Sequence, residues 1–190
     1  MSEALLMDVR FHRLLLAYDE DLARRARSGR CLRCGGVLHS ARYRRKPRGL
    51  PAGLGEEYRQ RFSFCCAVRE CRRRKTVTSL RFLGPKAYAA AIVVLVSALR
   101  HGATPAIRRR LQALVGASRR TITRWHRWWC DTFVTTPFWQ SVRASFDTPV
   151  SIAAIPASLL ERFSGDPATQ LLGVLRFLGP LTGGAAVIAM

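Results

Sequence analysis

Two cysteine turns decide the fold of this chain: Cys31-Leu-Arg-Cys34-Gly35-Gly36, and Phe64-Cys65-Cys66-Ala-Val-Arg-Glu-Cys71. A Cys-x-x-Cys sequence followed by two glycines is typical of a zinc knuckle, because the turn directs two thiolates at one ion while backbone amides approach the sulfur atoms. The second turn supplies two further thiolates and completes a tetrahedral four-sulfur site. The sequence therefore predicts a zinc ribbon whose metal ligands are Cys31, Cys34, Cys66 and Cys71.

Two neighbouring residues, Cys65 and Cys66, are candidates for the third metal ligand. Phe62, Phe64 and Cys66 alternate along a predicted strand that ends at Cys66, which favours Cys66, although the sequence alone leaves Cys65 open. His39 is a reserve ligand. The alternatives to a metal site are a disulfide framework and unrelated buried thiols. Because no secretory signal peptide is visible, we expect a cytoplasmic location, where reducing conditions disfavour disulfides.

The positive charge lies mainly in the middle of the chain. Its 190 residues include 32 Lys and Arg against 12 Asp and Glu, and the formal net charge is +20. Residues 24–81 carry +15 and residues 82–147 carry +8, whereas residues 148–190 are neutral overall. Nucleic acid is the expected partner rather than a membrane, because most of these charges lie outside long amphipathic segments.

The N-terminal part is predicted to contain a helix followed by a basic loop. Apolar residues recur at helical spacing from Phe11 to about Arg27, and this helix is expected to pack against the ribbon. Residues 40–55 are basic and rich in turn residues, which predicts an exposed loop or hairpin tip. The β-branched and apolar segment from Thr76 to Leu83 predicts the strand that closes the ribbon sheet.

Two basic clusters in this region are candidate contacts to a nucleic-acid backbone. The first cluster lies in the basic loop and the second follows Cys71. The alternative for the loop cluster is an exposed basic loop that binds only solvent. Their members are Arg44, Arg45, Arg72, Arg73, Arg74 and Lys75.

A second predicted unit begins near Gly84-Pro85 with an apolar helix from Lys86 to Arg100. Its thirteen apolar residues fall short of the roughly 20 that a membrane-spanning helix needs, so we expect a buried central helix and no membrane partner. His101-Gly102 is expected to end it, and Thr104-Pro105 to begin the next helix.

The segment from Ala106 to Trp129 has the plan of a helix-turn-helix. Gly116 permits a tight turn and Ser118 is placed to cap the second helix. Ile122, Trp125, Trp129 and Phe133 recur at intervals of three or four residues and are expected to face inward. The outer face then carries cations that suit the major groove of DNA, where arginine hydrogen-bonds guanine edges. The candidate contacts are Arg119, Arg120, Thr123, Arg124 and Arg127, and the alternative is an amphipathic helix with a solvated basic side.

The C-terminal part is predicted to be neutral and helical, with helices at residues 138–146, 157–163 and 168–178 and a frayed tail. The expected fold is therefore mainly α with a small β zinc ribbon, an α+β class. The expected divisions are residues 1–83 for the N-terminal helix and ribbon, residues 84–147 for the helix-turn-helix domain, and residues 148–190 for the C-terminal helices and tail.

Three segments, CLRCGG, FCCAVRECRRRKTVTSLRFLG and ASRRTITRWHRWW, resemble the DNA-binding part of bacterial insertion-sequence transposases and transposon-associated accessory proteins. The resemblance implies that a zinc ribbon and a helix-turn-helix bind double-stranded DNA of a mobile element. It maps the four cysteines to the ribbon ligands and suggests a separate transposase or recombinase as a partner.

The sequence lacks the features of the enzymes it resembles. Their catalytic domains are similar to RNase H and place three carboxylates around divalent metal, whereas the only acidic residues after Glu70 are Asp131, Asp147, Glu161 and Asp166. We therefore expect a non-enzymatic DNA-binding protein, for which oligomer formation is open. The alternatives are an RNA-binding zinc protein, using the basic loop, and a protein-interaction module.

Overall fold

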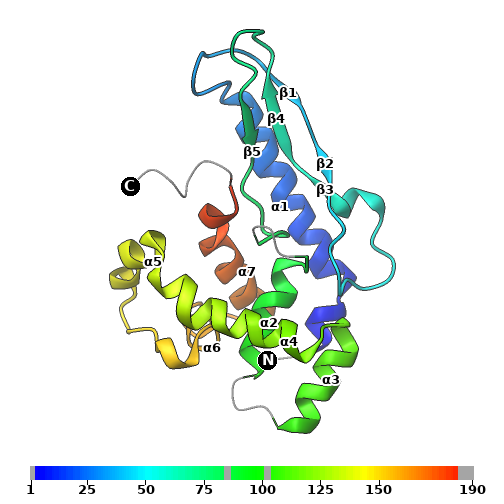
Figure 1. Ribbon diagram of the computed structural model, residues 1–190, viewed down its shortest axis with the longest axis vertical. Helices are drawn as coiled ribbons and strands as arrows, with labels where there is room; N and C mark the ends of the chain where they lie inside the picture. The colour runs from blue at the N-terminus through cyan, green and yellow to red at the C-terminus, as the bar shows by residue number, and fades with distance from the viewer. Residues whose placement is uncertain (1–2, 84–86, 101–103, 184–190) are drawn as a thin grey trace.

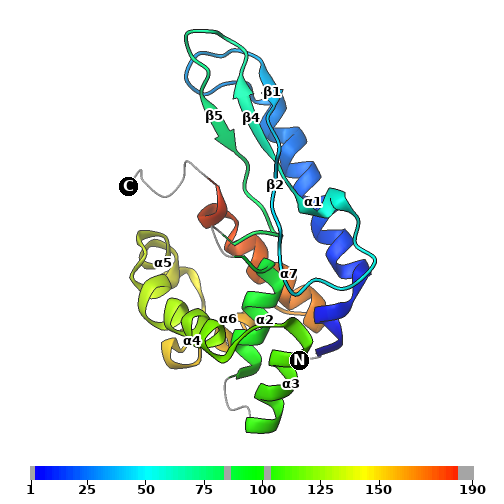
Figure 2. The ribbon, with the colours of Figure 1, turned by 45° about the vertical axis from the view of Figure 1, so that its right-hand side comes forward.

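The computed structural model describes residues 3–83, 87–100 and 104–183. It is elongated, with an arm (residues 9–83) that extends from a body of short helices (residues 87–183) (Figures 1 and 2). The chain is rich in helix and contains a small antiparallel sheet, which agrees with the predicted α+β class. The residue ranges predicted for the domains stay predictions.

The arm is built on α1 (Val9–Ser28), which follows a 3-10 turn at Glu3–Met7. Asp8 caps this helix by accepting a hydrogen bond from the backbone N–H of Arg10 at 2.8 Å. At the other end the backbone N–H of Gly29 donates to the carbonyl of Arg25 at 3.2 Å. The helix predicted from Phe11 to Arg27 is confirmed, and it lies along the sheet (Figure 1).

Strands β1 (Leu38–Ser40), β4 (Ser63–Cys66) and β5 (Arg74–Thr76) form an antiparallel sheet in the order β1-β4-β5. Leu38 pairs with Cys66, so the first and second cysteine turns meet at one end of the sheet. A second, two-stranded sheet pairs β2 (Tyr43–Arg44) with β3 (Gln60–Arg61). The chain between them includes a 3-10 turn at Glu56–Arg59, and the predicted hairpin tip lies here.

The strand predicted from Thr76 to Leu83 is wrong beyond Thr76, because the chain there folds around a buried carboxylate. Asp19 on α1 accepts hydrogen bonds from the backbone N–H of Leu80 at 2.7 Å, from Nε of Arg81 at 2.8 Å and from the hydroxyl of Ser79. The side chains of Asp19 and Arg81 are both fully buried. Residues 79–81 are therefore held against α1 by Asp19, and Arg81 also donates to the carbonyl of Gln60 at 2.8 Å, so the strand does not continue.

Helix α2 (Ala90–Arg100) is the centre of the body, and the predicted burial is confirmed from Ala90 to Ala98. It contacts α3 (Pro105–Val115), α4 (Arg119–Arg127), α6 (Ala157–Leu160) and α7 (Pro167–Phe177). It begins later than predicted, because Tyr88 and Ala89 form bridges with Arg48 and Phe82. The predicted boundary residues Gly84 to Lys86, and the stop at His101-Gly102, lie outside the described residues.

Of the predicted C-terminal helices, α7 (Pro167–Phe177) agrees with the predicted 168–178 to within one residue at each end, whereas the helices predicted at residues 138–146 and 157–163 are shorter than predicted. Helix α4 continues into a π-helical turn (Trp128–Thr132) and a 3-10 turn (Phe133–Thr135), and α5 covers only Pro137–Val142 before a further 3-10 turn at Arg143–Ser145. Other 3-10 turns lie at Ile152–Ala154 and Gly179–Thr182. Residues 184–190, the end of the predicted tail, lie outside the described part of the chain.

Two clusters of buried apolar side chains hold the fold together. The larger one surrounds α2 in the body, and the smaller one lies in the arm between α1 and the sheet. Helix α1 contributes to both, since Leu15 belongs to the body cluster and Leu16 and Ala23 belong to the arm cluster. Within the described ranges, helices are too short or too polar to cross a lipid bilayer.

Candidate metal centre and basic surfaces

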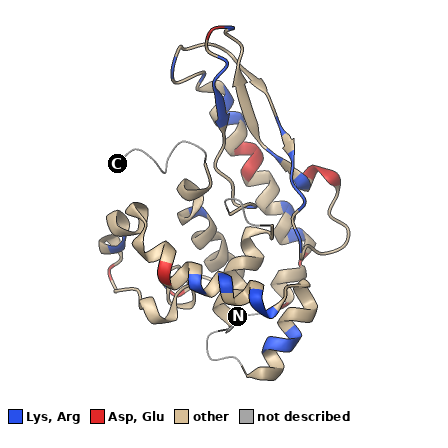
Figure 3. Cartoon of the chain, viewed as in Figure 1, with Lys and Arg blue, Asp and Glu red and all other residues tan. Residues whose placement is uncertain are grey.

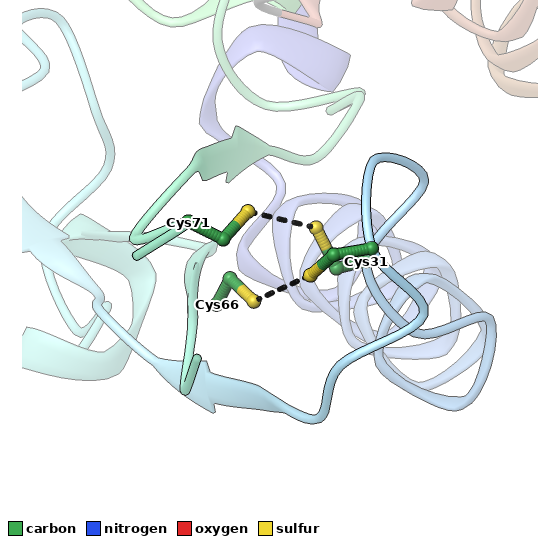
Figure 4. A group of neighbouring side chains, drawn as sticks. Cys31, Cys66 and Cys71 are labelled. Atoms are coloured by element: carbon green, nitrogen blue, oxygen red, sulfur yellow. Dashed lines mark hydrogen bonds between the residues drawn. The ribbon is translucent and has the colours of Figure 1, made fainter. Parts of the chain in front are cut away.

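The two cysteine turns bring four thiols together at the far end of the arm (Figure 4). Cys31 and Cys71 have sulfur atoms 3.7 Å apart, those of Cys34 and Cys66 are 3.4 Å apart, and all four lie within 4.8 Å of one another. Cys31 and Cys66 are buried, Cys71 is half-buried and Cys34 is exposed. One metal ion can therefore contact all four sulfur atoms, as predicted from the sequence.

The first turn is shaped by its two glycines. The backbone N–H of Cys31 donates to the carbonyl of Gly36 at 2.9 Å, and that of Gly35 donates back to Cys31 at 2.8 Å. Gly35 has a φ of 68°, in the left-handed region that favours glycine. A Cβ atom on Gly36 would lie 2.6 Å from the Val68 side chain and 3.1 Å from the sulfur of Cys66, so a side chain there would push the two turns apart.

The second turn selects Cys66 over Cys65. Cys66 ends β4 and its backbone N–H donates to the carbonyl of Arg73 at 3.0 Å, while Cys71 donates to Val68 at 3.0 Å. Cys65 points out of the cluster, with its sulfur 3.4 Å from the carbonyl of Arg72. His39, the reserve ligand, is exposed on β1 and lies outside the cluster.

The surroundings of the thiols affect their protonation in opposite directions. Backbone N–H groups of Arg33 and Cys34 donate to the sulfur of Cys31 and lower the pKa of this thiol to about 6. Burial raises the pKa of the Cys66 thiol to about 12. A bound cation must displace the proton of Cys66, so metal affinity is expected to weaken as pH falls.

Helices α3 and α4 form the second predicted site. Gly116 between them has a φ of 61°, and the hydroxyl of Ser118 accepts from the backbone N–H of Thr121 at 3.2 Å, as the sequence indicated for a turn and a cap. Tyr88 fixes this turn by donating its hydroxyl to the carbonyl of Gly116 at 3.0 Å, and its ring packs edge-on against Trp125. Trp125 and the other predicted inward residues, Ile122, Trp129 and Phe133, are buried.

The outward side of α4 carries the predicted cations. Arg119, Arg120, Arg124 and Arg127 are exposed and Thr123 is half-buried. Among the described residues, the ion pairs do not involve these four arginines. Arg119 also lines a cleft of about 410 Å³ between α3 and α4, together with Arg108 and Arg109. This side of the body is therefore a concentrated cationic surface, visible in Figure 3 along α3 and α4.

Some of the predicted basic residues of the arm interact with other parts of the chain, and others are exposed to solvent. Arg44 forms an ion pair with Glu56, and the guanidinium of Arg45 lies over the ring of Phe82, 5.7 Å from its centroid. Lys75 donates to the carbonyl of Ala26 at the end of α1, with a distance of 3.5 Å. The remaining predicted residues, Arg72, Arg73 and Arg74, are exposed. The structure thus places the predicted contacts in two groups, on the arm and on α4.

Sequence reasoning missed two sets of residues. The first is the pair of Asp19 and Arg81, which are 62 positions apart, so no local pattern joins them. The second is a set of arginines beside the metal centre, from the last turn of α1 to the first cysteine turn. In the sequence, Arg27 marks only the approximate end of the first predicted helix, and Arg30 and Arg33 have no predicted role, although the absence of acidic residues from 22 to 55 was a signal.

Comparison with models of protein families, with curated proteins and with solved structures finds no match to this chain.

Proposed function

We propose that this chain is a zinc-containing protein that binds double-stranded DNA, with α3 and α4 acting as a helix-turn-helix. Zinc is the metal that the four thiols fit best. Thiolates favour zinc, and zinc–sulfur bonds of about 2.3 Å in a tetrahedron give sulfur–sulfur distances of about 3.8 Å. The distances of 3.7 and 3.4 Å between paired cysteines are close to this value.

The observation that carries the DNA proposal is the two-sided character of α4. Its inner side is fixed by Ile122 and Trp125, which are 6% and 4% exposed, so the helix has one defined orientation. Its outer side presents arginines at positions 120, 124 and 127. Residues 104–130 contain no Asp or Glu, and the carboxylate of Glu3 that contacts α3 is paired with Arg110. Asp131, which follows this segment, lies beyond the last of these arginines.

In this proposal α4 enters the major groove and Arg124, at the middle of the exposed side, contacts base edges. The zinc ribbon on the arm contacts the phosphate backbone. The resemblance to transposon proteins favours the ends of a mobile element as the target, with a separate transposase or recombinase as partner. A role without catalysis fits the acidic residues of the described chain: Asp166 caps α7 with a hydrogen bond of 2.8 Å, and Asp131, Asp147 and Glu161 are exposed.

The test is selection of bound sequences from a random duplex pool, followed by affinity measurements on the selected site. Arg124→Ala should cost about 1 to 3 kcal/mol on that site and less on random duplex, because a base contact carries specificity. Arg143→Ala, on the 3-10 turn after α5, also removes one positive charge. It should leave the affinity for the selected site and for random duplex unchanged. Equal losses on both duplexes would reduce Arg124 to a phosphate contact, and no preferred duplex at all would refute the helix-turn-helix proposal.

The second candidate is binding of structured RNA through the basic loop of residues 42–48. Against it, Arg44 and Arg45 are engaged within the arm by Glu56 and Phe82. Competition between duplex DNA and structured RNA at equal salt separates the two proposals. Metal analysis of the same sample should give one zinc per chain, and less than one would contradict the zinc assignment.

A further inference from the structure

The arm ends in a second cationic surface, most of which the proposed function does not use. Two hollows of about 390 and 230 Å³ share Leu38 as a wall. Arg27 and Arg30 line the first, and Arg33, Arg73 and Arg74 line the second. With Arg72, which is exposed beside them in sequence, these residues form what we call the arm-tip surface: Arg27, Arg30, Arg33, Arg72, Arg73 and Arg74.

The charge of this surface is little compensated. Residues 22–55 contain no acidic residue, and Glu70 is the only one in residues 58–83. Asp21 on α1 is already paired with Arg24 and Arg25, at 2.9 and 2.7 Å. Five arginines that line two adjacent hollows, with Arg72 next to them in sequence, therefore suit a polyanion with several charges rather than a single small anion.

The backbone provides an independent observation. Among the residues that the structure describes, the non-glycine residues with positive φ are Arg30, at 53°, and Arg72, at 42°. Arg30 precedes the metal-cluster residue Cys31, and Arg72 follows Cys71. Glycine adopts this conformation at the least cost, so an arginine at each position places a cation beside each cysteine turn against local preference. Strain of this kind clusters at functional sites.

Helix α1 runs from the body to the arm-tip surface, and its 20 residues span about 30 Å at 1.5 Å per residue. In the 3-10 turn that precedes α1, Glu3 pairs with Arg110 of α3 at 2.8 Å. The body end of α1 therefore lies near the helix pair α3–α4. One turn of B-DNA measures about 34 Å, close to this span. Figure 3 marks Lys and Arg positions both near the tip of the arm and along α4.

We propose that the arm-tip surface binds phosphates of the same duplex about one helical turn away from the bases that α4 contacts. This inference rests on the proposed DNA-binding function and deepens it, because it assigns the arm's phosphate contact to particular residues and to a position about one turn from the α4 site. The arm tip supplies affinity without sequence preference, because phosphates are the same at every base pair.

The test uses the full chain with Arg30→Gly and Arg72→Gly together, because glycine suits positive φ and the fold and metal content should be retained. On the selected duplex, the slope of log affinity against log salt should become shallower by about 0.9 for each phosphate that is no longer neutralised, or about 1.8 for both. Protection of the backbone from hydroxyl radicals should disappear about one turn from the α4 site and persist at that site.

Two further variants make the result specific. Arg27→Gln with Arg74→Gln leaves the strained positions unchanged and should make the slope shallower by a similar amount. Arg143→Gln with Arg176→Gln removes two charges from the body and should leave slope and footprint unchanged.

The outcomes separate this inference from the proposed function. One outcome is that the wild-type chain selects a duplex while both arm-tip variants keep the wild-type salt slope and the wild-type footprint on it. In that case the arm-tip inference is wrong and the α4 proposal stands. If both variants keep duplex binding and lose binding to structured RNA, the arm tip is an RNA surface and the inference is again overturned. If the wild-type chain selects no duplex, the proposed function itself has failed.

Discussion

Replacing Asp19 by Asn removes one negative charge from the fully buried pair that joins α1 to the segment after β5. The carboxylate accepts from the backbone N–H of Leu80, from Nε of Arg81 and from Ser79. An Asn amide has the same shape but replaces one acceptor oxygen by a donor, which faces at least one of these N–H groups. Arg81 then remains charged and buried without a counter-ion.

The expected loss of stability follows from that uncompensated charge. Removing one partner of a buried ion pair costs about 3 to 5 kcal/mol, a large part of the roughly 5 to 15 kcal/mol by which native proteins are stable. Arg81 keeps hydrogen bonds to the carbonyls of Tyr58 and Gln60, the latter at 2.8 Å, so part of its polar environment survives. With a urea slope of about 3 kcal/mol per M, the midpoint should fall by roughly 1 to 2 M.

The assay is urea unfolding of metal-loaded protein, followed by far-ultraviolet circular dichroism. Asp21→Asn is the matched control, two residues along the same helix, because Asp21 pairs with Arg24 and Arg25 near the surface. Surface pairs contribute about 0 to 1 kcal/mol, so this variant should unfold near the wild-type midpoint. Equal midpoints for the two variants would refute the view that the buried pair stabilises the packing of the segment after β5 against α1.

Three other predictions concern the metal centre, the turn and pH. Cys66→Ser should lower bound metal below one ion per chain and Cys65→Ser should not, as metal analysis can check, because only Cys66 faces the cluster. Ser118→Ala should cost about 1 kcal/mol in urea unfolding, by loss of the N-cap of α4, while Ser145→Ala should cost little. Burial lowers the pKa of His12 from its ordinary value of 6.5, so the unfolded chain takes up this proton first as pH falls. The stability contributed by neutral His12 is present above pH 6.5 and is lost below it, so the difference in urea midpoint between wild type and His12→Gln should shrink from pH 7.5 to 5.5.

Local patterns were sufficient for the helices, the turns and the cysteine cluster. The two cysteine turns, the glycine turn at Gly116 and the cap at Ser118 each depend on a few neighbouring residues, and the structure has them as predicted. The choice of Cys66 over Cys65 also followed from a local rule, since alternate residues of a strand face the same side.

Pairings between distant segments were not accessible in this way. Asp19 lies within the predicted first helix and Arg81 within a predicted strand, and no local pattern joins them, whereas the structure buries both as a pair, 62 positions apart. Tyr88 and Ala89 have good helical neighbours, yet bridges to Arg48 and Phe82 delay the start of α2. In each case a contact between distant segments formed the hydrogen bonds or ion pair of these residues, and it overrode the secondary structure that local preference predicts for them.

Helix α1 explains why the metal centre and α4 act as parts of one rigid molecule. Leu15 packs in the body, Leu16 and Ala23 pack in the arm, and Leu22 contacts both clusters. Asp19 lies between them and binds the chain that leads from β5 to the body. Removal of metal therefore takes away the support of the small arm cluster first, while the first half of α1 stays bound to the body. Because one continuous helix is packed in both regions, the spacing between the arm tip and the body is set by the fold, and the spacing of the two proposed DNA contacts would follow from it.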